Sequence, residues 1–138
     1  MSLTQLGHHS ALPESSDAAV LEMVPNPHPG LLYLVRFTCP EFTSLCPVTG
    51  QADFAQITIE YVPNLRCVES KSLKFYLASY RNERAFNEAV TNRILDDFVR
   101  ACSPREATVT AEFSARGGIA LTVRAEFPNQ ASFVPRRR

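Results

Sequence analysis

The sequence ATVTAEFSARGGIALTVRAEF, residues 107–127, predicts a β-hairpin. Apolar residues occupy every second position in residues 107–113 and again in residues 119–127, with mostly polar residues between them. An alternation of period two is typical of a strand that is buried on one face only. Between the two runs, Arg116-Gly-Gly118 supplies the turn, because glycine adopts the positive φ angles that tight hairpin turns need. We therefore predict two antiparallel strands here.

A second pair of strands is predicted earlier in the chain, from the apolar run of residues 31–37 and the alternation in residues 55–61. Between the two strand pairs, the apolar period becomes helical. Apolar residues recur three or four positions apart in two sets, which are Leu73, Tyr76, Leu77 and Tyr80, then Phe86, Val90, Ile94 and Phe98. Each set makes one apolar stripe, so we predict two helices. The second should end at Ser103-Pro104, since the residue before proline avoids the helical region.

The order ββααββ predicts an α+β fold, in which two helices cover one face of a four-stranded antiparallel sheet. The other face carries polar residues, so we expect it to be solvated or to line a wet interior. Residues 1–29 mix serine, proline and histidine without a sustained pattern, and the chain closes with Pro135-Arg-Arg-Arg138. We therefore predict a flexible N-terminal segment, residues 1–29, and a single domain, residues 30–138, with a short basic tail.

Composition limits the classes of function. With 138 residues, 45% of them apolar, the chain is long enough for one domain with a modest core. The 14 acidic and 14 basic residues balance, which argues against a nucleic-acid binder and favours a small-molecule ligand. The four cysteines form no Cys-x-x-Cys pair, and no apolar run is long enough for export or for spanning a bilayer. We expect a cytoplasmic protein without disulfides and without a membrane partner.

A candidate nucleophile lies in EFTSLCPVTGQADF, residues 41–54. Cysteine attacks carbon as the thiolate, and Cys46 is predicted to lie in a turn, near the carboxylate of Asp53 and the lysines of VESKSLKFY, residues 68–76. The alternative for Cys46 is an ordinary buried cysteine, and for Asp53 a residue that only caps the turn. Structural roles are assigned to the remaining cysteines, Cys39, Cys67 and Cys102.

These two stretches closely resemble the NADPH-dependent 7-cyano-7-deazaguanine reductases of queuosine biosynthesis, a tRNA-modification pathway, which reduce a nitrile to an aminomethyl group. The resemblance runs from about Phe37 to about Gly118. Cys46-Pro-Val-Thr-Gly-Gln-Ala-Asp53 matches the family's catalytic motif, and Glu69-Ser-Lys-Ser-Leu-Lys-Phe-Tyr76 matches its signature for substrate and NADPH. The resemblance implies that Cys46 adds to the nitrile carbon as a thioimide, while Asp53 manages the proton.

The resemblance also implies the substrate contacts. A deazaguanine base presents a row of N–H donors, and a buried carboxylate accepts two of them side by side. Glu88 falls where related enzymes hold their heterocycle with a glutamate, and Val68, Glu69 and Ser70 match further contacts. Asn87 stands where the family usually has histidine; we expect it to remain a substrate contact, although it cannot titrate near neutral pH. The alternative for Glu69 and Glu88 is that both are ordinary surface residues that face solvent.

The expected cofactor is NADPH, consumed twice per turnover. Lys71 and Lys74 lie one helical turn apart, so both are candidates for its phosphates, and Arg116 in the glycine hairpin is a less supported third. No Gly-x-Gly-x-x-Gly follows a predicted strand, which argues against a Rossmann-type site. Zinc-ligand spacing is missing and no histidine follows His28, so no catalytic metal is expected.

The resemblance implies the tunnelling fold, in which sheets from several subunits join edge to edge and active sites lie between subunits. We therefore expect a homo-oligomeric ring; the number of subunits is not fixed, and a homodecamer of two stacked pentamers is the family-like arrangement. Three other functions stay open. They are an amidinotransferase acting on the same nitrile in tRNA, a metal-dependent pterin or purine cyclohydrolase, and a weakly active or non-catalytic base-binding variant caused by Asn87. The lysine-bearing signature and the missing metal ligands argue against the first two.

Overall fold

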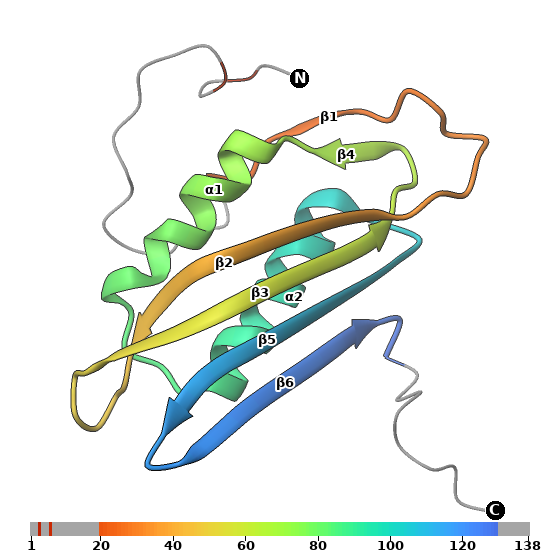
Figure 1. Ribbon diagram of the computed structural model, residues 1–138. Coiled ribbons are helices and arrows are strands. Elements are labelled where there is room, and N and C mark those ends of the chain that lie inside the picture. The colour runs from red at the N-terminus through yellow and green to blue at the C-terminus, as the bar shows by residue number, and fades with distance from the viewer. Residues whose placement is uncertain (1–2, 4–5, 7–19, 130–138) are drawn as a thin grey trace, which may run out of the picture.

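The computed structural model describes residue 3, residue 6 and residues 20–129 of the chain. Its centre is a four-stranded antiparallel sheet with the strand order β2-β3-β5-β6. Both helices lie on one face of this sheet (Figure 1). The bounds are β2 Val35–Leu45, β3 Ala52–Val62, α1 Ser70–Ala78, the 3-10 helix η2 Ser79–Asn82, α2 Asn87–Cys102, β5 Glu106–Arg116 and β6 Ile119–Phe127. The predicted α+β class and the ββααββ order of the main sheet are confirmed.

The core lies between the helices and the sheet, where the apolar positions of the strands converge. Ile57 and Ile59 of β3 are fully buried, and the register pairs Ile59 with Val109 of β5. Helix α2 covers this surface with Ile94 and Phe98, which are also fully buried. Burying one such side chain contributes about 1.5–3 kcal/mol relative to leaving it exposed. The alternation in the strands and the stripe on α2 therefore account for the two-layer arrangement.

The other face of the sheet is polar, as predicted. Arg36 of β2 forms an ion pair with Glu60 of β3 at 2.9 Å, and Gln56 donates a hydrogen bond to Glu112 of β5 at 3.4 Å. These cross-strand pairs fall at positions that alternate with the core residues, because successive side chains of a strand point to opposite faces.

Helix α2 ends where the sequence predicts. Ser103 adopts a left-handed conformation with φ of 49°, its N–H donates to the carbonyl of Val99, and Pro104 follows. The apolar stripe starts later than predicted, because Phe86 is the N-cap residue and is 62% exposed. Among the described residues, no helix combines the length and the hydropathy that crossing a bilayer requires.

Strand β2 differs from the prediction at both ends. The predicted run of residues 31–37 enters the strand only at Val35, and Leu32 is 76% exposed, so the expectation of a strand over residues 31–34 is wrong. The strand instead continues to Leu45 through an irregularity in register between Cys39 and Phe42. Pro40 is tolerated there because β2 is an edge strand, in which one row of N–H groups needs no partner.

Part of the predicted N-terminal segment, residues 20–29, forms a strand that contacts the domain. Strand β1 (Met23–Pro25) pairs with β4 (Arg66–Val68) in a small antiparallel sheet. The side chains of Leu21 and Met23 are buried in the core, and this apolar contact holds the segment against the domain. Most of residues 1–19, and the predicted arginine tail, lie outside the described residues.

Candidate active site

The turn between β2 and β3 carries the candidate nucleophile. The N–H of Cys46 donates to the carbonyl of Gln51 at 2.8 Å, and the N–H of Gly50 donates to the carbonyl of Cys46 at 2.9 Å. Gly50 has a φ of 71°, and a Cβ atom there would lie 2.9 Å from a guanidinium nitrogen of Arg84. The positive φ is what favours glycine at this position, because residues with a side chain rarely adopt it, whereas the Arg84 side chain can move.

Hydrogen bonds at this turn favour the thiolate of Cys46. The pKa of the thiol is lowered to about 7, chiefly by the hydroxyl of Thr49, then by the backbone N–H groups of Thr49 and Val48. Arg116 contributes a smaller lowering of the same pKa, and partial burial opposes it. A thiol with such a pKa is about half ionised at neutral pH, which is what a cysteine nucleophile requires.

The other cysteines offer a direct comparison. Burial raises the pKa of Cys39, and burial raises that of Cys102 to about 12. We therefore expect iodoacetamide at pH 7 to alkylate Cys46 well ahead of both, with a rate that rises through pH 7 and levels off above about pH 8. Thr49→Val should move this midpoint upward by about one pH unit, since the strongest donor to the sulfur is lost.

Peptide mapping by mass spectrometry over a pH series measures these rates. Thr58→Val, on the polar face of the sheet, is the matched control and should leave the midpoint unchanged. A Thr49→Val protein with the wild-type midpoint would contradict the role of this hydroxyl.

Asp53 lies close to the same turn and is buried. It is the second residue of β3, its side chain is only 7% exposed, and one carboxylate oxygen lies 2.5 Å from Nη1 of Arg116. The second terminal nitrogen of Arg116 donates to the side-chain oxygen of Gln51. The β5–β6 turn therefore reaches the β2–β3 turn at one end of the sheet (Figure 1).

The start of α2 lies at this end too. The N–H of Leu45 donates to the carbonyl of Glu83, and the N–H of Ala85 donates to the carbonyl of Leu45, which fixes the segment before α2 beside the nucleophile turn. Asn87 and Glu88 are the first two residues of α2, the former half-buried and the latter exposed. The structure thus brings the predicted substrate residues Asn87 and Glu88 to the end of the sheet that holds Cys46.

Val68, Glu69 and Ser70 lie elsewhere. They join β4 to the start of α1, whereas the Cys46 turn lies near the end of α1 (Figure 1). The carboxylate of Glu69 caps α1, because it accepts hydrogen bonds from the N–H groups of Lys71 at 2.7 Å and Ser72 at 2.8 Å. A nine-residue helix spans about 13 Å, so one chain alone does not bring these residues to Cys46.

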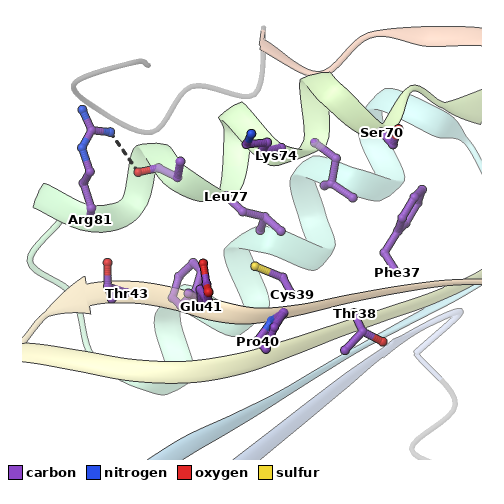
Figure 2. Close-up of a pocket in the computed structure, with 13 residues that line it drawn as sticks. Phe37, Thr38, Cys39, Pro40, Glu41, Thr43, Ser70, Lys74, Leu77 and Arg81 are labelled. Carbon is purple, nitrogen blue, oxygen red and sulfur yellow. Dashed lines mark hydrogen bonds between the residues drawn. The ribbon is translucent and has the colours of Figure 1, made fainter. Parts of the chain in front are cut away.

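A groove of about 540 Å³ runs between β2 and α1 (Figure 2). Its floor is apolar, with Phe42 from the strand and Leu73 and Leu77 from the helix. Lys74 and Arg81 contribute positive charge to its lining, and Glu41 contributes one negative charge. The two lysines that were predicted to bind phosphate have different surroundings. Lys74 lines the groove, and the ammonium group of Lys71 lies 5.8 Å from the centre of the Phe75 ring.

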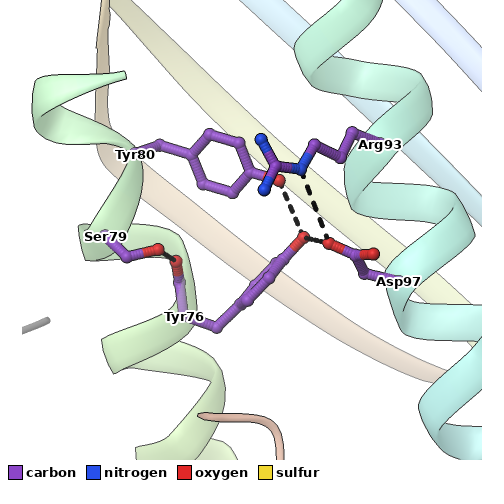
Figure 3. A network of polar contacts seen from close by, with 5 residues as sticks. All are labelled: Tyr76, Ser79, Tyr80, Arg93 and Asp97. Carbon is purple, nitrogen blue, oxygen red and sulfur yellow. Dashed lines mark hydrogen bonds and ion pairs between the residues drawn. The ribbon is translucent and has the colours of Figure 1, made fainter. Parts of the chain in front are cut away.

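A buried polar network joins the two helices (Figure 3). The hydroxyl of Tyr76 donates to Asp97 at 2.5 Å and lies 2.8 Å from the hydroxyl of Tyr80. Arg93 approaches Asp97 at 3.9 Å and lies over the ring of Tyr80. Because the network links α1 and η2 to α2, it fixes the segment that docks against Leu45 and the Cys46 turn.

Three residues near the site escaped the sequence analysis. Ser44 is fully buried, is the cross-strand neighbour of Asp53, and its hydroxyl has no hydrogen-bond partner among the described residues. Its position near the end of β2, two residues before Cys46, is the available signal. Thr49 could have been identified from its position in the predicted turn, close to Cys46 in the sequence. Arg84 gave none, because its packing on Gly50 depends on how the helix connection docks.

Within the described part of the chain, there is no group of three or more histidine, cysteine, aspartate or glutamate side chains that could hold a metal ion. The expectation of a reaction without a catalytic metal stays a prediction.

Comparisons with known proteins agree on one family. A family model described as "QueF-like protein" matches residues 52–132. The chain is 57% identical over 107 residues to an NADPH-dependent 7-cyano-7-deazaguanine reductase of Nitrosococcus oceani, covering 78% of this chain and 83% of the relative. The protein of the same name from Syntrophus aciditrophicus is 52% identical over 125 residues, covering 91% and 86%.

A solved structure supports the fold. The archaeosine synthase QueF-Like, crystallised in the apo form, superimposes with a TM-score of 0.63 at 27% sequence identity, covering 67% of this chain and 91% of that one. The tunnelling fold implied by the sequence resemblance is therefore confirmed.

Proposed function

Because the chain belongs to the QueF-like family, we propose that it reduces the nitrile of 7-cyano-7-deazaguanine to an aminomethyl group through a covalent bond to Cys46. It is an NADPH-dependent oxidoreductase of queuosine biosynthesis, as the names of relatives at 50–58% identity support. The observation that carries the proposed mechanism is the Cys46 turn, where a thiol with a pKa of about 7 lies close to a buried aspartate.

The first proposed step is addition of the thiol to the nitrile. The Cys46 sulfur forms a bond to the nitrile carbon, and one electron pair of the triple bond moves to the nitrogen. That nitrogen collects the proton which the thiol gave up, and Asp53 is suited to carry it from sulfur to nitrogen. No atom is lost, so the product is a thioimide whose mass is the sum of protein and nitrile.

The remaining steps are two reductions, for which NADPH supplies a hydride each time when it is bound. After the first, the carbon–sulfur bond breaks, Cys46 leaves as thiolate, and an imine remains. After the second, the imine nitrogen becomes a primary amine. Two protons from solvent complete the balance. The role of the protein in these steps is to hold the imine and to exclude water while the oxidised cofactor is exchanged for NADPH.

We propose that Lys71 and Lys74 bind the phosphates of NADPH. The groove between β2 and α1 supports this, because its apolar floor suits the flat rings of a dinucleotide and Lys74 and Arg81 supply positive charge for phosphate. Lys71 lies one helical turn before Lys74, at the start of the same helix.

We propose that Glu88 holds the donor edge of the deazaguanine, with Asn87 beside it. Glu88 is the stronger of the two glutamate candidates, because the carboxylate of Glu69 is engaged in capping α1. Asn87 cannot titrate near neutral pH, so Asp53 carries the proton transfer in this account. The distance between Ser70 and the Cys46 turn supports a site shared between two copies, in which Val68, Glu69 and Ser70 come from a neighbouring chain.

An assembly of copies follows from that shared site. Strands β2 and β6 are the two edges of the sheet, and an unpaired edge is a ready surface for pairing with another chain. We propose a ring in which these edges pair, and two stacked rings of five as the family-like arrangement. The amidinotransferase alternative is not favoured, since it uses no hydride and the relatives at 50–58% identity are named reductases.

Nitrile-dependent oxidation of NADPH tests the proposed function. We expect two molecules of NADPH to be consumed for each molecule of nitrile. The loss of NADPH absorbance measures the first quantity, and mass spectrometry should identify the amine as the product. NADH should be a poor substitute, because it lacks the 2′-phosphate. Consumption of the nitrile without oxidation of NADPH would contradict the proposal and would favour the amidinotransferase.

A further inference from the structure

We propose that Ser44 is a positioning residue for Asp53, whose carboxyl group it holds by a hydrogen bond while that group relays the proton in the addition step. The inference deepens the proposed function, on which it rests for the identity of the nitrile. It starts from a buried hydroxyl that makes no hydrogen bond within the described part of the chain.

Ser44 lies in the core-facing row of β2, near the end of the strand. It follows Phe42 on the same face, because alternate residues of a strand point to the same side. The ring of Phe42 packs against Tyr80, with the ring centroids 5.6 Å apart, so η2 covers this part of the face. Ser44 is fully buried there. A buried hydroxyl without a partner destabilises the fold, because it has given up water and gained no replacement.

Asp53 lies directly opposite Ser44 in the register of β2 and β3. Opposed residues of an antiparallel pair point to the same face, with Cβ atoms about 4.5–5.5 Å apart. A serine hydroxyl and an aspartate carboxyl group can bridge this separation after rotation of the serine side chain. Oδ1 of Asp53 faces Nη1 of Arg116, whereas Oδ2 accepts no hydrogen bond from the residues that the structure describes. Two neighbouring buried groups therefore each have capacity for the other.

A neutral donor at Oδ2 suits the addition step. Cys46 and Asp53 enter this step with one proton between them. The thiol gives that proton to the carboxylate, sulfur bonds to the nitrile carbon, and the carboxylic acid passes the same proton to the nitrogen. Each carboxyl oxygen has two lone pairs, so Oδ2 can accept from Ser44 with one and take the proton with the other. A hydroxyl fixes the orientation of the group without opposing its protonation as strongly as a second cation would.

Ser44→Ala tests the inference by stability and chemistry measured on one protein. A thermal melt should give a midpoint equal to or above that of the wild type, because the change removes an unpaired buried hydroxyl. The rate of adduct formation with the nitrile alone, followed by intact mass, should fall by about tenfold, since the carboxyl group loses its orientation. In an Asp53→Asn background the same change should have little further effect, since Ser44 acts through that carboxyl group.

Ser79→Ala is the matched control, because Ser79 is a fully buried serine whose hydroxyl donates to the carbonyl of Tyr76. It should melt at a lower temperature than the wild type and form the adduct at the wild-type rate. Ser44→Thr keeps the hydroxyl but adds a methyl group to a filled site. It should therefore be less stable than Ser44→Ala and yet form the adduct faster, an order that a purely structural role would not produce.

A Ser44→Ala protein that forms the adduct at the wild-type rate, or that loses stability and rate together, would overturn the inference. So would an undiminished effect of the change in the Asp53→Asn background, because Ser44 would then act independently of Asp53. Failure of the proposed function looks different. The wild-type protein itself would then form no adduct, and the inference would fall with the proposed function.

Discussion

Cys46→Ala is expected to reduce nitrile-dependent oxidation of NADPH by a factor on the order of 10⁴ or more, because the covalent route disappears with the sulfur. Cys46→Ser should lose nearly as much. Serine places a hydroxyl in the same turn, but the donors that stabilise a thiolate there cannot ionise a hydroxyl at neutral pH. Both variants should fold normally, since Cys46 is half-buried in a turn and makes no core contact.

Initial rates under saturating NADPH and nitrile measure this loss. Cys67→Ser is the matched control, because Cys67 is also half-buried and its sulfur lies 3.7 Å from the Tyr33 hydroxyl, which can donate to or accept from a serine hydroxyl as well. A Cys46→Ser protein that consumes nitrile at an undiminished rate would remove the nucleophile from the account.

Asp53→Asn is expected to slow turnover by about 10²–10⁴-fold, the range for loss of a positioned proton-transfer group. The amide keeps the shape of the carboxylate but cannot shuttle a proton from sulfur to nitrogen. It also gives up the ion pair with Arg116, so the guanidinium loses the partner that orients it. The adduct should therefore form slowly even in the absence of NADPH.

Single-turnover adduct formation separates this effect from cofactor binding. Glu60→Gln, which breaks the Arg36 pair on the opposite face, is the control for removing a carboxylate from β3. If Asp53→Asn forms the adduct at the wild-type rate but turns over slowly, Asp53 acts only in the later reduction steps. The proposed relay in the addition step would then be wrong.

The main sheet and both helices could be predicted because their apolar periods are strong and local. The β1–β4 pair could not, since each strand has three residues and their partners lie more than 40 positions apart. Strand β2 was misplaced because an exposed apolar run, residues 31–34, precedes it and Pro40 interrupts it. Only the tertiary fact that β2 is an edge strand explains why the strand continues through the proline.

The candidate site likewise has features that the sequence predicts and features that depend on the tertiary structure. The nearness of Cys46 and Asp53 follows from a turn of a few residues, which sequence spacing captures. The contact between Arg116 and Asp53 depends on the β3–β5 register and on the glycine turn, which bring together residues 63 positions apart. Glu69 is an uncommon N-cap residue, where serine, threonine, aspartate or asparagine is usual, so its capping role was not anticipated.

The intact mass of the protein after incubation with 7-cyano-7-deazaguanine alone tests the central claim most directly. We predict that the protein gains the mass of one whole nitrile molecule on the peptide that contains Cys46. This gain should be reversed by NADPH and absent from Cys46→Ala. An unchanged mass in the wild-type protein under saturating nitrile, or an adduct on any other residue, would contradict it.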